Sequence, residues 1–376
     1  MKTSTPNTTG GTDPTSMLRS TVRAIEPYVP ILPFEVLADR LERPIEEIIK
    51  LDANENLYGP SPLVRDALAD LDFPHIYPDP ENRALRNALS DFTGVPSENI
   101  FAGAGADEII DLTMRLFIDQ GDNIIDCPPT FGMYSFDAAV NGAETIVIER
   151  KDDFTLDLEA IVEAVSVYSP KLLFLTSPNN PDGGLISDEE LRTLLALPII
   201  VILDEAYIEF AGIENSRIDW VLEYENLIVL RTFSKWAGLA GLRVGYGAFS
   251  VRLLKELWKI KQPYNVSVAA TEAALVSLDD SVNLLQVVSE IRSERKRLSQ
   301  MLSGLPFVFP YPSHGNFVLC QVKGISALEL QQALSAAGIL VRYFDKPRLR
   351  DHIRISVGLP QHTDVLETIL SRISTE

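Results

Sequence analysis

The feature that most constrains the fold is an alternation of short apolar runs with amphipathic helical patterns between residues 98 and 265. Several of these runs are continuously apolar, which is typical of strands covered by helices on both faces. We therefore predict an α/β unit whose mostly parallel, mixed sheet lies between helices. The predicted strands cover residues 99–102, 123–127, 144–149, 172–176, 199–203, 227–230 and 245–249, and the clearest helices cover residues 107–117 and 134–141.

The pattern changes after residue 266 and predicts a smaller α+β unit. Its elements are a long helical stretch at 268–302, strands at 316–322, 340–344 and 352–357, and helices at 327–337 and 363–373. A tail rich in Thr, Gly and Pro without an apolar segment is expected to be disordered. We divide the chain into this tail (1–16), an arm that packs with the small domain and the partner subunit (17–61), a large domain (62–280) and the small domain (281–376).

The net charge of −20 argues against nucleic acid or an anionic membrane as the main partner, because both would be repelled. No apolar run reaches the roughly 20 residues that a membrane-spanning helix needs. The two cysteines, Cys127 and Cys320, lie far apart in apolar surroundings, which predicts buried thiols and a cytoplasmic protein. An anionic ligand must therefore be held by a local basic pocket. The four histidines match no catalytic pattern, and no metal site is expected.

Polar residues gather where four predicted strands end. They are residues 105–107, 177–181, 204–207 and 232–235. Ligands of open α/β sheets bind at the carboxyl ends of the strands. We therefore expect these four strand ends to converge on one crevice.

The last of these strand ends carries an amine. Lys235 follows the hydroxyl residues Thr232 and Ser234, and Arg243 comes a short loop later. Such a group suits a phosphorylated aldehyde, because the amine can form a Schiff base while the hydroxyls and the guanidinium hold the phosphate. Taken alone, a lysine after a serine is more often a solvated surface residue. Asp204 either caps the next helix or keeps a heteroaromatic nitrogen protonated, which is how pyridoxal phosphate becomes an electron sink.

The other strand-end residues each have two interpretations. Asn180 could shape a Pro–Asn turn or donate to a cofactor ring oxygen, and Tyr207 could donate to the same oxygen. Ala106 and Asp107 open a helix whose free N–H groups favour a phosphate, although Asp107 is also an ordinary helix-start residue. Phe131 could stack on a flat ring or fill the core.

Several motifs together resemble one family. Residues 177–181, 204–207, 234–235 and 241–243 occur in the order seen in fold-type-I pyridoxal-phosphate aminotransferases. The finer pattern resembles the histidinol-phosphate aminotransferases, from about residue 18 to the C-terminus. It rests on residues 51–56 (LDANEN), 105–108 (GADE), 128–134 (PPTFGMY), 204–210 (DEAYIEF), 340–342 (LVR) and 354–358 (RISVG).

The resemblance implies pyridoxal 5'-phosphate as cofactor and a role for each matching residue. Lys235 would form the Schiff base and shuttle the proton, Asp204 would pair with the ring nitrogen, and Phe131 would stack on the ring. Asn180 and Tyr207 would bond the ring oxygen. The phosphate would be held by Ala106, Asp107, Thr232, Ser234 and Arg243, and by Tyr58 of the partner subunit in a homodimer.

The same resemblance implies the substrates, histidinol phosphate with 2-oxoglutarate or glutamate, in histidine biosynthesis. Arg354 would grip the α-carboxylate of glutamate, and Arg342 would hold the phosphate of histidinol phosphate. Asn180 would also contact substrate, and Tyr28 of the partner subunit would close the pocket. Without the family, surface salt bridges would be the better interpretation of Arg342 and Arg354.

Two positions depart from the family pattern. Asp182 stands where a Thr usually follows Asn-Pro, and Leu57 stands where a Pro is common. We expect a difference in the turn at Asp182 and no loss of activity. The alternatives are an aminotransferase for aromatic amino acids, a decarboxylase of a phosphorylated amino acid, and a cofactor-binding regulator without catalysis. The last is disfavoured by the short tail and the negative charge.

Overall fold

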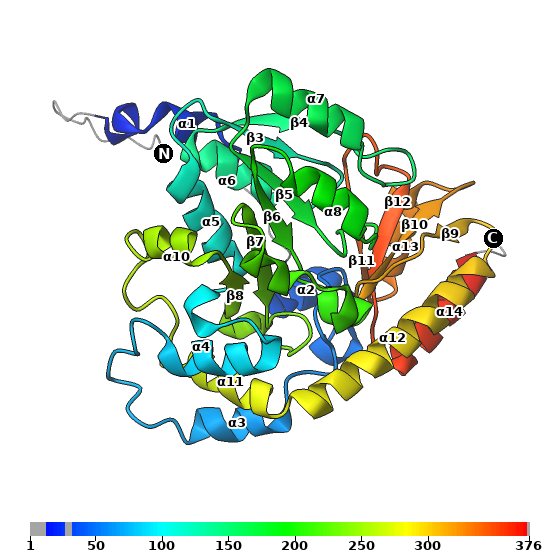
Figure 1. The fold of residues 1–376 in the computed structure, drawn as a ribbon. Helices are drawn as coiled ribbons and strands as arrows, with labels where there is room; N and C mark the ends of the chain where they lie inside the picture. The colour runs from blue at the N-terminus through cyan, green and yellow to red at the C-terminus, as the bar shows by residue number, and fades with distance from the viewer. Residues whose placement is uncertain (1–12, 27–31, 374–376) are drawn as a thin grey trace, which may run out of the picture.

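The structure is a computed structural model that describes residues 13–26 and 32–373 (Figure 1). Its larger sheet has seven strands, in the order β2-β8-β7-β6-β5-β3-β4. The pairs from β7 to β4 are parallel, whereas β8 runs antiparallel to both of its neighbours. The predicted mixed, mostly parallel sheet is therefore confirmed. The strands are β2 (Ile100–Gly103), β3 (Asn123–Asp126), β4 (Glu144–Val147), β5 (Leu172–Thr176), β6 (Ile200–Asp204), β7 (Leu227–Thr232) and β8 (Gly245–Ala248).

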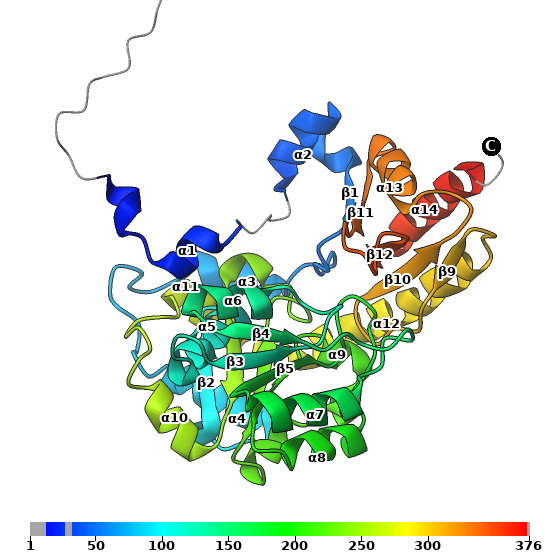
Figure 2. The same ribbon diagram turned by 90° about the horizontal axis from the view of Figure 1, so that it is seen from above.

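The central strands are buried because helices cover both faces of this sheet. Along β6, Ile202 joins one apolar cluster while Val201 and Leu203 join another, as the alternation of side chains in a strand requires. Figure 2 shows the two layers, with α5 and α6 on one side of the sheet and α7 and α8 on the other. These helices are α5 (Ala106–Phe117), α6 (Met133–Asn141), α7 (Leu158–Tyr168) and α8 (Asp188–Leu195).

The second sheet has five strands in the order β1-β11-β12-β10-β9. The long helix α12 (Ser281–Ser303) runs from the first sheet toward this one, and α14 (Pro360–Ile373) packs along it (Figure 1). Helix α13 (Ala327–Ala336) packs against β11. The strands are β1 (Ile49–Leu51), β9 (Val308–Pro310), β10 (Phe317–Val322), β11 (Ile339–Tyr343) and β12 (His352–Ser356).

The N-terminal part of the chain contacts helices that cover the first sheet and a strand of the second. Helix α1 (Ser20–Ala24) lies against α6, while α2 (Phe34–Leu41) places Leu37 beside Leu340 of β11. Strand β1 pairs in parallel with β11. Helices α3 (Pro62–Ala69) and α4 (Arg83–Thr93) pack on α11 (Val268–Asp279), and α9 (Ile208–Ala211) and α10 (Val251–Leu257) complete the helices. The domain boundaries stay a prediction.

The structure also bears on the sequence predictions for the N-terminal tail, the cysteines and membrane-spanning segments. The predicted disordered tail lies mostly in residues 1–12, outside the described residues, and Pro14–Met17 forms a 3-10 helix capped by Asp13. Cys127 and Cys320 are buried free thiols, as predicted. No helix within residues 13–26 and 32–373 is long and apolar enough to cross a membrane.

A buried ion pair joins the ends of β6 and β7. The Arg231 side chain is 2% exposed and its Nε donates to Glu205 Oε2 at 3.0 Å, with the Glu205 side chain 1% exposed. Ser216 Oγ also donates to that oxygen (2.7 Å), and the N–H of Arg217 donates to Oε1 (2.6 Å). Glu209 lies 4.0 Å from the same guanidinium, and burial raises the pKa of its carboxyl to about 7. Arg231 is therefore the positive centre of a solvent-excluded cluster.

We predict that Arg231→Met lowers the free energy of unfolding by about 3–5 kcal/mol, because Glu205 would be left buried without its cation. The matched control is Arg252→Met, whose pair with Glu225 is 81% and 67% exposed and should contribute about 0–1 kcal/mol. Thermal and denaturant unfolding of the two variants would measure the difference. Equal losses would contradict a special role for the buried pair.

Candidate active site

The parallel register places the predicted strand ends in one row. Thr176 pairs with Asp204, and Asp204 pairs with Leu230. A cavity of about 1250 Å³ opens beside this edge and reaches across to the second sheet. Six of the predicted site residues line it: Phe131, Asn180, Tyr207, Lys235, Arg342 and Arg354.

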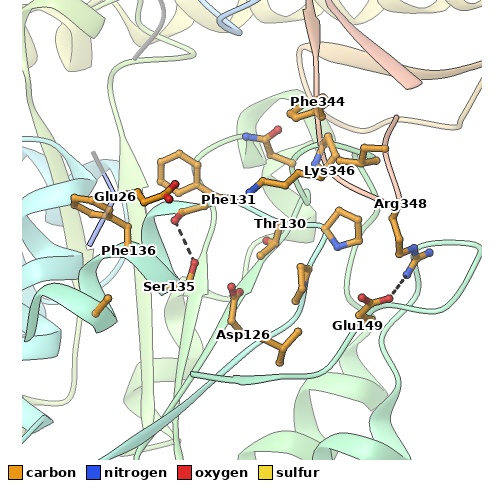
Figure 3. A pocket seen from close by; sticks show the side chains of 18 of the residues that line it. Glu26, Asp126, Thr130, Phe131, Ser135, Phe136, Glu149, Phe344, Lys346 and Arg348 are labelled. Carbon is orange, nitrogen blue, oxygen red and sulfur yellow. Dashed lines mark hydrogen bonds and ion pairs between the residues drawn. The ribbon is translucent and has the colours of Figure 1, made fainter. Parts of the chain in front are cut away.

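The walls of the cavity come from different parts of the chain. Figure 3 shows Phe131, Ser135 and Phe136 on one side, near Glu26 of the N-terminal segment. Phe344, Lys346 and Arg348, which follow β11, lie on the other side. The cavity therefore lies between the two sheets, with aromatic side chains on both walls.

Lys235 is held at the centre of the site by contacts with two other segments. Its Nζ donates to the Ala53 carbonyl at 3.3 Å and lies 5.8 Å from the centroid of the Tyr207 ring. The Tyr207 hydroxyl accepts from Asn54 Nδ2 at 3.2 Å. The amine and the phenol are thus positioned by the same short segment, residues 53–54, although β6 and β7 carry them.

Residues 52–56 connect the two sheets at this point. The N–H of Asn54 donates to Ser356 Oγ (2.8 Å), and Asn316 Nδ2 donates to the Asn54 carbonyl (3.0 Å). On the other side, Asn56 Nδ2 donates to the Trp236 carbonyl (3.1 Å), next to Lys235. Asn54 adopts a left-handed backbone conformation (φ 54°), which asparagine tolerates better than most residues. From the sequence, this segment was recognised only as a family motif, and no role was predicted for Asn54.

Asp204 is the last residue of β6 and is 4% exposed. Burial raises the pKa of its carboxyl to about 6, while hydrogen bonds from the Tyr134 hydroxyl (2.7 Å) and the Ala206 N–H (3.0 Å) act in the opposite direction. Among the described residues no cation lies within 4 Å of it. A buried carboxylate of this kind is stabilised by a cationic partner, and a protonated pyridine nitrogen is such a partner.

Tyr134 is a second residue of the site that was not predicted from the sequence. Its side chain is fully buried on α6, and its hydroxyl lies 2.8 Å from Thr176 Oγ1 as well as 2.7 Å from Asp204 Oδ2. Burial, followed by the charge of Asp204, raises the pKa of the phenol well above its ordinary value, so the hydroxyl keeps its proton and donates. The motif at residues 128–134 contains this tyrosine, but the contact forms only when α6 packs on the sheet.

Asn180 and Arg354 meet across the cavity. Arg354 Nη1 donates to Asn180 Oδ1 at 2.5 Å, and Nη2 donates to the Asp52 carbonyl at 2.7 Å. The guanidinium also lies over the rings of Phe317 and Phe344, at 5.5 and 5.7 Å. Because the Asn180 oxygen accepts from Arg354, its amide N–H groups are available as donors toward the cavity.

The N-terminus of α5 carries the groups predicted to bind a phosphate. Gly105 precedes the helix with φ 85°, and Arg243 pairs with Asp107 at 2.7 Å. The Thr232 hydroxyl donates to Ser234 Oγ (2.9 Å). A Cβ on Gly245 would lie 2.7 Å from the Ala106 nitrogen, so only glycine fits there. Free helix N–H groups, two hydroxyls and a guanidinium form a donor set that fits a phosphate.

Tyr58, like Asp204 and the residues predicted to bind the phosphate, does not line the cavity. Tyr58 lies near α12, where burial and then the charges of Glu290 and Glu294 raise the pKa of its phenol. Tyr28 lies outside the described residues. Asp182 is buried, accepts from Asn179 Nδ2 and from the Gly184 N–H (2.7 Å), and so closes the turn that carries Asn180. The expectation of unchanged activity at Asp182 stays a prediction.

We predict that Tyr134→Phe weakens binding of pyridoxal phosphate to the cofactor-free protein about tenfold near pH 6, since a hydrogen bond to a charged group contributes roughly 1.5–3 kcal/mol. Affinity should fall as the pH drops through about 6, where Asp204 takes up a proton and loses the charge that pairs with the ring nitrogen. Removing the donor raises the pKa of Asp204, so the fall should begin at higher pH.

Absorbance titrations from pH 5 to 8 would measure both effects. Tyr224→Phe is the control, because its hydroxyl bonds Arg192 away from the cavity. An unchanged pH dependence in Tyr134→Phe would show that the phenol does not act on Asp204.

Comparison with known proteins agrees with this geometry. The family model "Aminotransferase class I and II" matches residues 46–373. The chain is 54% identical over 358 residues to histidinol-phosphate aminotransferase 1, chloroplastic, of Arabidopsis thaliana, covering 95% of this chain and 86% of that protein. It is 51% identical over 368 residues to histidinol-phosphate aminotransferase of Roseiflexus castenholzii, covering 96% and 99%.

A solved structure adds the fold and a cofactor. Histidinol-phosphate aminotransferase of Sinorhizobium meliloti, in complex with pyridoxal-5'-phosphate, matches with a TM-score of 0.86 and 28% identity, covering 96% of this chain and 98% of that one. The family match agrees with a site that combines a buried carboxylate, an amine and a helix N-terminus whose donors fit a phosphate. The chain belongs to the class I and II aminotransferases and, within them, to the histidinol-phosphate aminotransferase family.

Proposed function

We propose that this protein is the aminotransferase that interconverts histidinol phosphate plus 2-oxoglutarate with imidazole-acetol phosphate plus glutamate, a step of histidine biosynthesis. The observation that carries the proposal is the pairing of Arg342 with Arg354 on β11 and β12, which places two guanidinium residues on one wall of the cavity that holds Lys235. Each substrate carries an anionic group, the α-carboxylate of glutamate or the phosphate of histidinol phosphate, and each anion has its own arginine. The two substrates react in turn at one site.

Pyridoxal phosphate, when bound, supplies an electron sink for the carbanion at the substrate Cα. The described residues divide the work of holding it. Asp204 would keep the ring nitrogen protonated, Asn180 and Tyr207 would donate to the ring oxygen, and Phe131 would cover a ring face. Ala106, Asp107, Thr232, Ser234 and Arg243 would hold the phosphate.

Lys235 is the acid–base group. Its Nζ removes a proton from the substrate Cα and returns it on the cofactor side. The Ala53 carbonyl and the Tyr207 ring orient the amine for this transfer. The amine is partly buried and faces the cavity between the two sheets, where the substrate Cα would lie.

Each of the two arginines binds the anionic group of a different substrate. Arg354, fixed by Asn180 and the Asp52 carbonyl, binds the α-carboxylate of glutamate or 2-oxoglutarate. Histidinol phosphate has no α-carboxylate, and Arg342 binds its phosphate instead. A homodimer belongs to the proposal, with Tyr58 and Tyr28 of the partner subunit completing the phosphate and substrate sites. A cytoplasmic location is supported by the two buried free thiols.

We predict that Arg342→Ala lowers kcat/KM for histidinol phosphate by about 10- to 100-fold, because a charge-assisted contact contributes roughly 1.5–3 kcal/mol. Turnover of glutamate should change little, and Lys235→Ala should abolish every transamination. Steady-state kinetics with a panel of amino donors, including phenylalanine, would measure this. Comparable losses for histidinol phosphate and phenylalanine would favour the aromatic aminotransferase instead.

A mixing experiment tests the shared site. Lys235→Ala and Tyr58→Ala dimers should each be nearly inactive. Random reassortment gives half heterodimers, each with one site that has both an intact lysine and Tyr58 of the partner subunit, so about one quarter of wild-type activity should return. Native mass spectrometry would verify the reassortment. If activity does not return in the reassorted sample, Tyr58 acts within its own subunit.

A further inference from the structure

One stretch of the chain supplies an unusual number of positive charges to the cavity. Arg342, Lys346, Arg348 and Arg354 all lie on β11, on β12 or on the connection between them, and all line the cavity. The protein as a whole carries a net charge of −20. This positive wall is therefore a local feature against an acidic background.

Two of the four cations, Arg354 and Arg348, form hydrogen bonds with other residues of the protein. Arg354 bonds Asn180 and the Asp52 carbonyl, as described above. Arg348 donates from Nη1 to the Arg150 carbonyl and from Nη2 to the Lys151 carbonyl (2.9 Å), and lies 3.9 Å from Glu149. These contacts hold both guanidinium groups in place, and the proposed function assigns Arg354 to the α-carboxylate of the other substrate.

The other two cations are Arg342 and Lys346. Within residues 13–26 and 32–373, no carboxylate lies within 4 Å of the charged groups of Arg342 or Lys346. Arg342 lies over the ring of Phe344 at 5.6 Å, which leaves its N–H groups free to bind an anion. The Lys346 side chain reaches from the β11–β12 connection into the cavity, toward the side that carries Phe131 (Figure 3).

The connection that carries Lys346 is held from both sides. The N–H of Leu349 donates to the Lys346 carbonyl at 2.9 Å, and Leu349 is buried with Phe154 and Leu319. Arg348 adds its bonds to the loop before α7 and lies 5.6 Å over the Phe154 ring. The backbone at Lys346 is thus fixed against the larger sheet, and only the side chain must be ordered when a ligand binds.

We propose that Lys346 is a second cation for the substrate phosphate and helps the enzyme select phosphorylated over unphosphorylated substrate. This inference rests on the proposed function. A phosphate monoester carries a charge of about −1.5 to −2 near pH 7, so Arg342 alone leaves part of it unbalanced. Arg342 supplies directional N–H donors, and Lys346 supplies a compact charge on a flexible stem.

The cavity also contains carboxylates. Glu26, Asp126, Glu144 and Glu149 line it, with Glu149 3.9 Å from Arg348 and Glu26 near Phe131 (Figure 3). Carboxylates repel an anion, so the phosphate is drawn to the cations of the β11–β12 wall. The imidazole end of the substrate carries no such charge penalty.

The test compares Lys346→Gln, Lys346→Arg and Arg350→Gln in the holoenzyme. Arg350→Gln is the matched control, because it removes one positive charge from the same connection, pairs with Asp345 at 3.0 Å and does not line the cavity. KM and kcat are measured for histidinol phosphate and for histidinol, with 2-oxoglutarate fixed. Inorganic phosphate serves as a separate probe, through its inhibition constant against histidinol phosphate.

We expect Lys346→Gln to raise KM for histidinol phosphate about tenfold and the phosphate inhibition constant by a similar factor, with kcat and the KM for histidinol changed less than about twofold. Lys346→Arg should restore both values to within about threefold, and Arg350→Gln should match wild type. Equal effects of Lys346→Gln and Arg350→Gln would overturn the inference, as would equal losses on both substrates.

The wild-type protein separates this outcome from a failure of the proposed function. A wild-type enzyme that transaminates other donors but not histidinol phosphate overturns both proposals. A wild-type enzyme that prefers histidinol phosphate, together with a Lys346→Gln variant of unchanged preference, overturns only the role of Lys346.

Discussion

The parallel register of β5, β6 and β7 is the constraint on which the site depends. Parallel strands lie about 4.8 Å apart and end at the same edge, so residues that follow them are brought together whatever their separation in the chain. Backbone bonds continue past the strand ends, from the Ser177 N–H to the Asp204 carbonyl (2.9 Å) and from the Glu205 N–H to the Leu230 carbonyl (2.8 Å). The buried Glu205–Arg231 ion pair also joins the ends of β6 and β7.

That edge alone makes half a site. The second sheet contributes both arginines, and residues 52–56 tie it to the first. Lys235 donates to the Ala53 carbonyl and Arg354 donates to the Asp52 carbonyl, so neighbouring peptide groups position the amine proposed for acid–base catalysis and the guanidinium proposed to bind the carboxylate. A shift of one sheet against the other would therefore disturb proton transfer and substrate binding together, which couples the two functions through a few hydrogen bonds.

The sequence predicted the elements that depend on local pattern. Continuous apolar runs identified the buried strands, because each run is covered on both faces. Strands β1 and β9 were not predicted, since each has three residues and β1 pairs with β11, almost 300 positions away. Tyr134 and Asn54 escaped for a similar reason: their partners, Asp204 and Tyr207, are fixed only by packing.

The arginines show a different limit of sequence reasoning. Nothing in their local pattern distinguishes a ligand-binding arginine from a surface salt bridge, and only the resemblance to a family gave Arg342 and Arg354 a role. Asp182 shows the opposite case, in which a residue expected to alter a turn is buried and holds that turn closed through Asn179 and Gly184. The local sequence pattern predicts the turn or strand to which a residue belongs. The burial of its side chain depends on the distant segments that pack against it.

The distribution of charge separates cofactor chemistry from substrate choice. At the strand ends, Asp204 is buried and its hydrogen bonds come from fixed groups, so a substitution there leaves polar atoms without partners and affects every substrate. On the β11–β12 wall, Arg342 is half-buried and Lys346 is exposed, and within the described residues no carboxylate lies within 4 Å of their charged groups. Arg354 joins this wall to the strand ends through its hydrogen bond to Asn180, and substitutions at Arg342 or Lys346 leave that bond in place. In the proposed function, the choice of substrate anion therefore depends on the second sheet and the binding of the cofactor on the first.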